Sequence, residues 1–286
     1  MASFKEMKKN RMSNLQNLSK QVEKLAEKPS YEDDRIWKLE RDKTGNGYAV
    51  IRFLPAAVNE DVPWVRIWTH GFKGPGGWYI ENSLTTLGKD DPVSKANTAL
   101  WNSGVDSDKN IARERRRKLN YYSNIYIVED AANPENVGKV MLFRYGKKIF
   151  EKITGVMNPE FQDETPLNPF DFWEGANFKI KMRQVDGFPN YDKSEFTDVC
   201  PLHEDEKKME EIWGQQYSLN EIIEEKNFKQ YAELEARFNT VIARIDHGDG
   251  SSEFVGNIEE STGDPVASGE KTDDTLDYFK KLAEQE

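Results

Sequence analysis

A run of cationic side chains leads directly into two tyrosines near the middle of the chain. In "RERRRKLNYY" the cations are Arg113, Arg115, Arg116, Arg117 and Lys118, and the tyrosines are Tyr121 and Tyr122. The segment "LFRYGKKIF" mixes the same residue types, as Phe143, Arg144, Tyr145, Lys147 and Lys148. Cations attract negative charge, and aromatic rings offer flat faces for stacking. Together they suit a guest that carries both negative charge and flat faces.

Single-stranded nucleic acid is such a guest, because its phosphates alternate with unpaired bases. Binding it without sequence preference needs cations along the backbone and aromatic faces for stacking, worth about 1–3 kcal/mol per base. A single basic run is more often a solvated loop, with nearby aromatics that fill a core. Two such runs, each merged with aromatics, favour the binding interpretation. Adjacent residues of a strand face opposite sides, so Tyr121 and Tyr122 cannot have equal roles.

The charge of the chain is strongly polarised around these segments. The net charge is −11 over 286 residues, but residues 1–28 carry +4 and residues 246–286 carry −9. This pattern predicts a basic arm (1–28), a core (29–245) and an acidic tail (246–286). The tail is rich in Gly, Ser, Asp and Glu, so we expect it to be disordered.

Between residues 45 and 200 the sequence predicts mainly β-strands, and these strands must position the cations. The expected strands are "GYAVIRFLP", "WVRIWTHGF" and "WYIE" around a hairpin tip at 74–77, then "NYYSNIYIVED", "GKVMLFRY" and "ANFKIKMRQV". "GKKIFEKITGVM" favours a helix, residues 82–112 are polar and poorly patterned, and "GFPNYDKSEF" reads as a turn. Residues 204–245 have a helical period, with a capping-box pattern at Ser218 and Glu221. The pattern suits a mainly β fold with appended helices, an oligonucleotide-binding (OB) Greek-key barrel with an inserted segment.

Membrane and catalytic classes receive little support. No apolar run is long enough to span a bilayer, and one cysteine, Cys200, cannot form an internal disulfide, so we expect a reducing, cytoplasmic location. Cys200 and His203 are close in sequence and suggest a nucleophile or half of a metal site. A nucleophilic pair needs a third, orienting group and a structural zinc needs four ligands. We therefore predict no enzyme and leave a metal-dependent hydrolase as a remote alternative.

Several long strings resemble one family closely. They are "GNGYAVIRFLP", "HGFKGPGGWYIE", "RRKLNYYSNIYIVEDAANPENVGKV", "FRYGKKIFEKI" and "WEGANFKIKMRQVDGFPNYDKSEF", followed by an acidic tail. This order is similar to that of the replicative single-stranded DNA-binding protein of T-even-type bacteriophages. The likeness is strong from about Asp42 to Phe196 and extends in character to both termini.

The resemblance implies a role in phage DNA replication, recombination and repair inside an infected bacterium. It implies an arm for cooperative self-association and a tail that recruits replication and recombination proteins. Its cationic motifs fall on Lys8, Lys9, Arg11 and Ser13 in the arm and on Arg116, Arg117 and Lys118 in the core. Its DNA cleft would include Arg52, Tyr121, Tyr122, Phe143, Arg144, Phe188 and Tyr191, with Trp101 as a further aromatic.

The resemblance also implies a structural zinc, held by one histidine and three cysteines in a subdomain at about 70–112. In this chain the histidine is present as His70, but the other positions are Ser83, Asp91 and Ser94. Serine is a poor zinc ligand, so we predict that the metal is absent and that no cofactor replaces it. The segment would then depend on a small cluster formed by Trp78, Tyr79, Leu84, Leu87, Val93, Leu100 and Trp101, or stay mobile until DNA orders it.

Two other functions remain open from the residues alone. A single-stranded RNA would satisfy the same stacking and phosphate contacts. An acidic interaction scaffold, whose arm and tail recruit proteins and whose basic run is incidental, belongs to a different class. Salt-dependent quenching of aromatic fluorescence by oligonucleotides separates the scaffold from either binder.

Overall fold

The structure is a computed structural model that describes residues 33–243. The predictions for the arm and the tail lie outside the described residues. The chain divides into two units, between Ile36 and Trp37. The described part of the first unit contains an ion pair of 2.7 Å between Arg35 and Asp33. The second unit begins at Trp37 and contains the sheet from β2 onward and all of the described helices.

The described residues contain nine strands, five α-helices and four short 3-10 helices. The strands are β1 (Ile36–Trp37), β2 (Gly47–Phe53), β3 (Val65–Gly74), β4 (Gly77–Asn82), β5 (Lys118–Asp130), β6 (Val140–Tyr145), β7 (Ala176–Val185), β8 (Phe188–Asn190) and β9 (Glu195–Val199). The helices are η1 (Leu84–Leu87), α3 (Pro92–Asn102), α4 (Asp106–Glu114), η2 (Pro134–Asn136), α5 (Lys147–Met157), α6 (Glu206–Gly214), η3 (Asn220–Ile223), η4 (Glu225–Asn227) and α7 (Tyr231–Ile242). The fold is therefore mainly β with appended helices, as predicted.

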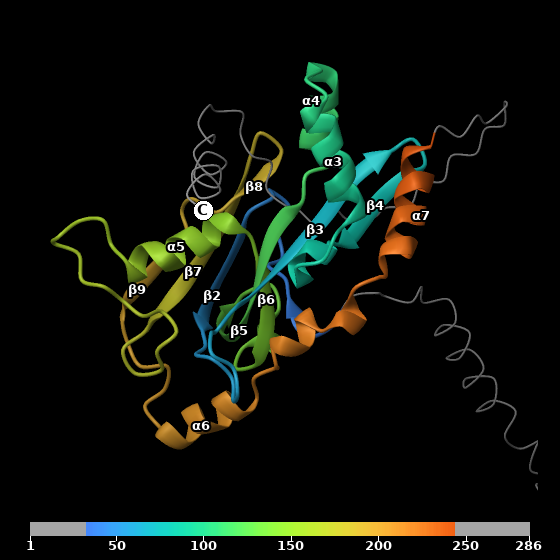
Figure 1. The fold of residues 1–286 in the computed structure, drawn as a ribbon. Helices are drawn as coiled ribbons and strands as arrows, with labels where there is room; N and C mark the ends of the chain where they lie inside the picture. Colours follow the sequence, from blue (N-terminus) through green and yellow to red (C-terminus); the bar gives the residue numbers. More distant parts are fainter. Residues whose placement is uncertain (1–32, 244–286) are drawn as a thin grey trace, which may run out of the picture. The chain divides into compact units, whose positions relative to one another are not determined.

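Strand β5 pairs with three other strands of the sheet (Figure 1). It pairs antiparallel with β2, β3 and β6, and β2 pairs in turn with β7. The register of β5 and β6 places Tyr121 opposite Tyr145 and Tyr122 opposite Arg144. The register of β3 and β5 places Trp68 opposite Leu119 and Thr69 opposite Lys118. These pairings bring the two predicted cationic segments onto neighbouring strands.

The main core lies between this sheet and helix α5. Gly146 caps the helix with extended backbone, and Ile149 and Ile153, four residues apart, share one face of it. Both are buried with Phe53 and Phe178 in one cluster. Burial of such side chains contributes roughly 1.5–3 kcal/mol each. This packing holds Lys147 and Lys148 on the first turn of α5.

A second cluster sits under the hairpin of β3 and β4. Its members from the N-terminal half are Phe72, Tyr79, Leu84 and Val93, and those from the C-terminal half are Phe228, Leu234, Phe238 and Val241. Tyr79, Leu84 and Val93 were predicted here, but Trp78 and Trp101 are 43% exposed and the contribution of α7 was not foreseen. The cluster holds residues 70–112 against α7.

The hairpin approaches α7 closely because glycines form its tip. Gly76 donates its backbone N–H to the carbonyl of Val241 at 2.9 Å. A Cβ atom at Gly76 would collide with the carbonyl oxygen of Thr240. The predicted tip at 74–77 is therefore confirmed, and its glycines are needed for contact with α7.

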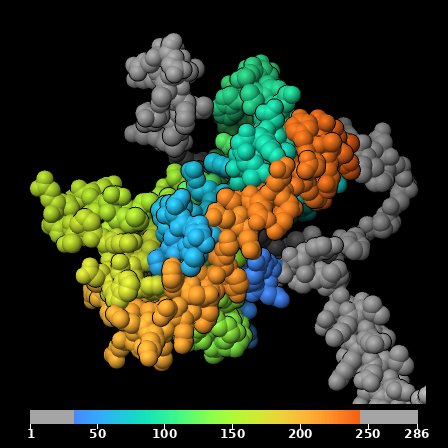
Figure 2. Space-filling model, turned by 60° about the horizontal axis from the view of Figure 1, so that its bottom comes forward, coloured from blue at the N-terminus to red at the C-terminus, as the bar shows by residue number. Residues whose placement is uncertain are grey.

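The segment from α6 to α7 forms a band across one face, beside the loop after β2 and beside α3 (Figure 2). The side chain of Asn124 on β5 bonds both the N–H and the C=O of Tyr217, at 3.0 and 2.8 Å. Ser218 donates to Glu60 at 3.0 Å. The predicted capping box at Ser218 and Glu221 is wrong, because the N-cap of η3 is Leu219 and has no side-chain hydrogen bond. The band covers the sheet face that carries Asn124.

Two local expectations need correction. Residues 82–112 contain η1, α3 and α4. The polar residues Ser83 and Asp91 cap η1 and α3, whereas α4 follows Val105 without a side-chain cap. Phe188–Asn190 is a strand paired with β7, and the turn lies at Asp186 and Gly187, whose φ angles are 52° and 83°. Within 33–243 no helix combines the length and apolar character needed to cross a bilayer.

Candidate nucleic-acid interface

The cationic run, Arg113, Arg115, Arg116, Arg117 and Lys118, crosses from a helix to a strand. Arg113 lies in the last turn of α4, and Lys118 is the first residue of β5. Four of the five side chains are exposed, and Arg115 is half-buried. Within the described residues no carboxylate forms an ion pair with Arg116, Arg117 or Lys118. The run is therefore an open cationic surface.

Alternate arginines of the run lie over aromatic rings. The guanidinium of Arg113 is 5.4 Å from the ring centroid of Trp101, and that of Arg117 is 4.2 Å from Trp68. Such cation–π contacts contribute about 0.5–1 kcal/mol at exposed sites. They place two of the four exposed cations, Arg113 and Arg117, beside aromatic rings, and a single strand is bound through these two residue types.

Arg115 is directed differently. Its guanidinium lies 5.6 Å from Phe72 and 5.8 Å from Phe238, over the second cluster. Burial lowers the pKa of Arg115 from its usual value. This arginine packs against the protein, while its neighbours face outward.

Trp68 was missed by the sequence reasoning. It lies on β3, opposite Leu119, and is half-buried. The signal was available, because "WVRIWTHGF" precedes the cationic run as a paired strand. Only the register of β3 and β5 shows that the ring meets Arg117.

Most of the predicted aromatics are in the core. Phe143 and Tyr145 are 6% and 3% exposed, and the Tyr145 hydroxyl bonds that of Ser123 at 2.9 Å. Tyr121 is 6% exposed and stacks on Phe150, with centroids 3.9 Å apart and planes 9° apart. Tyr122, on the opposite face, is 9% exposed. In this structure, then, these four rings have little face open to a base.

Arg52 is also placed inside the protein. It is fully buried, and its Nη2 donates to the carbonyls of Asp171 and Cys200 at 2.9 and 2.8 Å. Its Nη1 lies 3.4 Å from Asn177 Oδ1. The structure thus shows that Arg52 links β2 to the segment before β7 and to the residue after β9, and that its guanidinium is not exposed.

Arg144 is half-exposed on β6. It donates to Asn120 at 3.1 Å, and Asn120 donates to Thr69 at 3.0 Å. These bonds run across three neighbouring strands, β6, β5 and β3. They fix Arg144 on the face of β5 that also carries Lys118.

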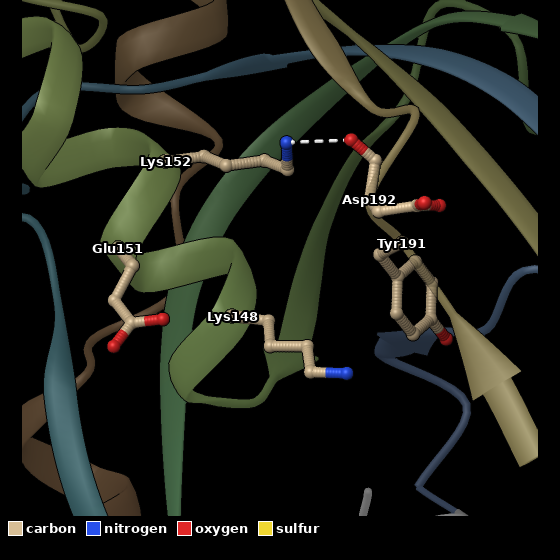
Figure 3. A pocket seen from close by; sticks show the side chains of 5 residues that line it. All are labelled: Lys148, Glu151, Lys152, Tyr191 and Asp192. Carbon is tan, nitrogen blue, oxygen red and sulfur yellow. Dashed lines mark hydrogen bonds between the residues drawn. The ribbon is translucent and has the colours of Figure 1, made fainter. Parts of the chain in front are cut away.

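A pocket of about 300 Å³ lies between α5 and the loop after β8 (Figure 3). Its walls are Lys148, Glu151, Lys152, Tyr191 and Asp192. Lys152 donates to the backbone carbonyl of Asp192 at 2.9 Å, which ties the loop to the helix. Lys148 and Tyr191 extend toward the same opening (Figure 3). A cation beside an aromatic ring again suits a phosphate next to a base.

Two further predicted residues, Lys147 and Phe188, are close in sequence to the pocket residues Lys148 and Tyr191. Lys147 pairs with Glu151 at 3.3 Å on the surface of α5. Phe188 is 50% exposed on β8. The structure therefore offers two exposed cationic groups, the run at α4–β5 and the pocket at α5–β8.

The positions that the resemblance linked to zinc do come together, as a polar network of His70, Ser83, Asp91 and Ser94. His70 Nε2 is 3.2 Å from Asp91 Oδ1 and 3.4 Å from Ser94 Oγ. Ser83 Oγ donates to Asp91 Oδ2 at 3.0 Å. His70, Ser83 and Asp91 are each at most 2% exposed.

This donor set does not fit a structural zinc. Such sites use four Cys, His or carboxylate ligands, and the network contains two of these residue types and two hydroxyls. Residues 33–243 contain no group of three or more His, Cys, Asp or Glu side chains that could hold a metal ion. Burial opposes ionisation of Asp91, but bonds from the His70 ring, the Ser94 amide and the Ser83 hydroxyl outweigh it and lower its pKa to about 2.

Cys200 and His203, whose closeness in sequence suggested catalysis, each contact other residues. Cys200 Sγ is 3.7 Å from Arg52 Nη1, and His203 Nδ1 accepts the backbone N–H of Asp205 at 2.9 Å. His203 thus acts at the start of α6, where Asp205 is the cap.

Comparison with known proteins agrees with the geometry. The family model described as gp32 DNA binding protein like matches residues 45–242. The chain belongs to this family. It is 40% identical to the single-stranded DNA-binding protein of Enterobacteria phage T2 over 231 residues, 79% of this chain and 76% of the relative. It is also 40% identical to the single-stranded DNA-binding protein of Enterobacteria phage T4 over 216 residues, 74% and 72% of the two chains.

Proposed function

We propose that this gp32-like protein binds single-stranded DNA, without catalysis, in phage DNA replication, recombination and repair. The observation that carries the proposal is the exposed cationic run with Arg117 over Trp68 and Arg113 over Trp101. Those contacts occur in a chain 40% identical to proteins named for binding single-stranded DNA. The place of action is then the cytoplasm of an infected bacterium.

The DNA path follows the exposed residues. The cationic run would hold phosphates, with Trp101 and the open part of Trp68 as stacking faces. Arg144, Lys147, Lys148, Phe188 and Tyr191 would form a second stretch. The buried side chains of Arg52, Tyr121, Tyr122, Phe143 and Tyr145 would support this surface from below.

The finer architecture is part of the proposal. The antiparallel set β2, β3, β5, β6 and β7 would form a variant OB barrel, with α5 as its capping helix. Support comes from Ile149 and Ile153 of α5, which are buried in the same cluster as Phe53 and Phe178. Residues 29–245 would form the binding core, with an inserted subdomain at about 70–112.

The termini would supply the remaining functions. The basic arm, with Lys8, Lys9, Arg11 and Ser13, would mediate self-association along DNA. The acidic tail would recruit replication and recombination proteins. Both proposals rest on charge and on the resemblance.

The test is a titration of intrinsic fluorescence with oligothymidine over a salt series. We expect quenching that weakens steeply as salt rises, since phosphate neutralisation releases counterions. A double variant, Arg116→Gln with Arg117→Gln, should reduce the salt dependence. The control is Lys207→Gln with Lys208→Gln, which makes the same change of charge on the exposed surface of α6.

The rival functions predict other results. Equal competition by a matched RNA oligomer would favour a general single-strand binder over a DNA binder. Absence of salt-dependent quenching would favour the acidic scaffold.

A further inference from the structure

The His70 ring lies between two parts of the structure that are distant in sequence. On one side Nε2 faces Asp91, the cap residue of α3, at 3.2 Å. On the other side Nδ1 is 3.0 Å from the backbone carbonyl oxygen of Arg115, inside the cationic run. One buried ring therefore connects the start of α3 to the segment that carries the charges.

Two of the oxygens near the ring, Asp91 Oδ1 and the Arg115 carbonyl oxygen, act as acceptors, while Ser94 Oγ, 3.4 Å from Nε2, can donate or accept. A backbone carbonyl can only accept, and an ionised carboxylate can only accept. The ring therefore lies within hydrogen-bond distance of an acceptor on each side, Asp91 Oδ1 at 3.2 Å and the Arg115 carbonyl oxygen at 3.0 Å. The second carboxylate oxygen accepts from Ser83 Oγ at 3.0 Å and from the Leu84 amide at 3.2 Å, and Oδ1 accepts the Ser94 amide at 2.9 Å. The buried carboxylate is thus fully satisfied.

We propose that the polar network of His70, Ser83, Asp91 and Ser94 is a metal-free tie that positions the cationic run for single-stranded DNA. A hydrogen bond to Asp91 stands where a metal bond would otherwise anchor the ring. Asp91 and His70 are positioning residues that act through the Arg115 backbone. This inference rests on the proposed function for its DNA readout, but not for its structural readout.

The atoms around His70 Nε2 are spaced like the ligands of a zinc ion, although the residues are not a zinc-binding set. Ligands about 2.0–2.3 Å from a tetrahedral zinc lie roughly 3.3–3.8 Å from one another. The separations around His70 Nε2, 3.2 Å and 3.4 Å, are close to that range. Replacing the two serines and Asp91 by cysteine should therefore create a zinc site with one histidine and three thiolates.

The experiment compares the full-length protein with three variants. Asp91→Ala removes the tie, and Asp90→Asn changes the exposed neighbouring carboxylate as a matched control. The triple variant Ser83→Cys, Asp91→Cys, Ser94→Cys, kept in reductant, tests whether a bound zinc can replace the tie. Each is assayed for zinc content and for thermal unfolding with and without chelator, in the absence of DNA. Each is then titrated with oligothymidine over a salt series.

We expect the natural protein to contain no stoichiometric zinc and to unfold at the same temperature with chelator. Asp91→Ala should lower the melting temperature by several degrees and reduce the salt slope, by about 0.7 for each phosphate that the displaced run no longer neutralises. Asp90→Asn should change neither quantity. The triple variant should bind one zinc, regain the natural slope, and lose it with chelator.

Several results would overturn the proposal. Stoichiometric zinc in the natural protein would show that the network is a metal site. An unchanged salt slope in folded Asp91→Ala would show that the network does not position the run. A folded triple variant that stays zinc-free would show that the four positions do not converge as a metal site would. If the natural protein failed to bind oligothymidine, the proposed function would fail, while the zinc and unfolding results would still test the tie.

Discussion

The guanidinium of Arg117 lies 4.2 Å from the ring centroid of Trp68. Arg117 immediately precedes β5 and Trp68 lies on β3, and the pairing of those strands brings the two side chains together. A charge held over a ring has a defined position, so it loses less conformational freedom when it meets a phosphate. This contact is the centre of the proposed DNA surface.

Arg117→Ala should weaken oligothymidine binding and reduce the salt slope by about 0.7, the value for one phosphate on a single strand. Arg117→Lys should keep the slope but lose affinity, because an ammonium lacks the planar face that stacks on Trp68. Binding isotherms at several salt concentrations separate the two effects. If Arg117→Ala kept the full slope, Arg117 would not contact a phosphate.

Arg52 should behave as a residue of the fold. Arg52→Met leaves the buried carbonyls of Asp171 and Cys200 without their donor, at a cost on the order of 3 kcal/mol. We expect a lower denaturant midpoint and an unchanged salt slope for DNA. If Arg52→Met kept the natural stability but reduced the salt slope, Arg52 would instead contact DNA.

Lys148 provides a test of the pocket at α5. Lys148→Ala removes a cation beside Tyr191, so we expect weaker binding and a smaller slope, while Lys152→Ala should also loosen the loop that it ties through Asp192. Lys139→Ala, outside the pocket, is the control. Binding equal to that of the control in both variants would exclude the pocket from the DNA path.

The polar network predicts a stability change in acid. The pKa of Asp91 is lowered from 3.8 to about 2, so its ionised form stabilises the folded state at pH values above about 4. That contribution, on the order of 2 kcal/mol, is lost as the pH falls from about 4 to about 2. Asp91→Asn should be less stable near neutral pH and show a flatter acid limb in denaturant titrations. Parallel curves for the two proteins would contradict this prediction.

The acidic tail should compete with DNA. Residues 246–286 carry a net charge of −9, and their deletion should raise DNA affinity most at low salt, where screening is weakest. Titrations of the full-length and shortened chains across salt would measure the difference. Equal affinity at every salt concentration would refute competition by the tail.

The strands could be predicted from the sequence because their apolar residues alternate and turn residues separate them. The alternation also placed Tyr121 and Tyr122 on opposite faces of β5. It could not show that both faces are covered. Phe150 of α5 stacks on Tyr121, and the band that bonds Asn124 comes from residues more than 90 positions later.

For the same reason, local sequence patterns predict only part of the candidate DNA surface. Exposed cations such as Arg116 and Lys118 follow from local composition, since a dense run of charge cannot be buried. Arg52 lies in an apolar strand and has no local sign of its distant partners. Trp68 became part of the surface only through strand register. Local patterns thus identify the charges, while tertiary contacts decide which rings accompany them.

The second cluster has a consequence for the order of folding. Glu81 on β4 bonds Lys229, 148 positions later, and the aromatic face of the hairpin is closed by Phe238 and Val241. Contacts of such large sequence separation form late, because the intervening chain must first be brought together. During synthesis the apolar face of the hairpin must therefore stay exposed until nearly the whole described chain has left the ribosome. A nascent chain halted before α7 should bind hydrophobic-surface probes and chaperones, and should lack an ordered cationic run.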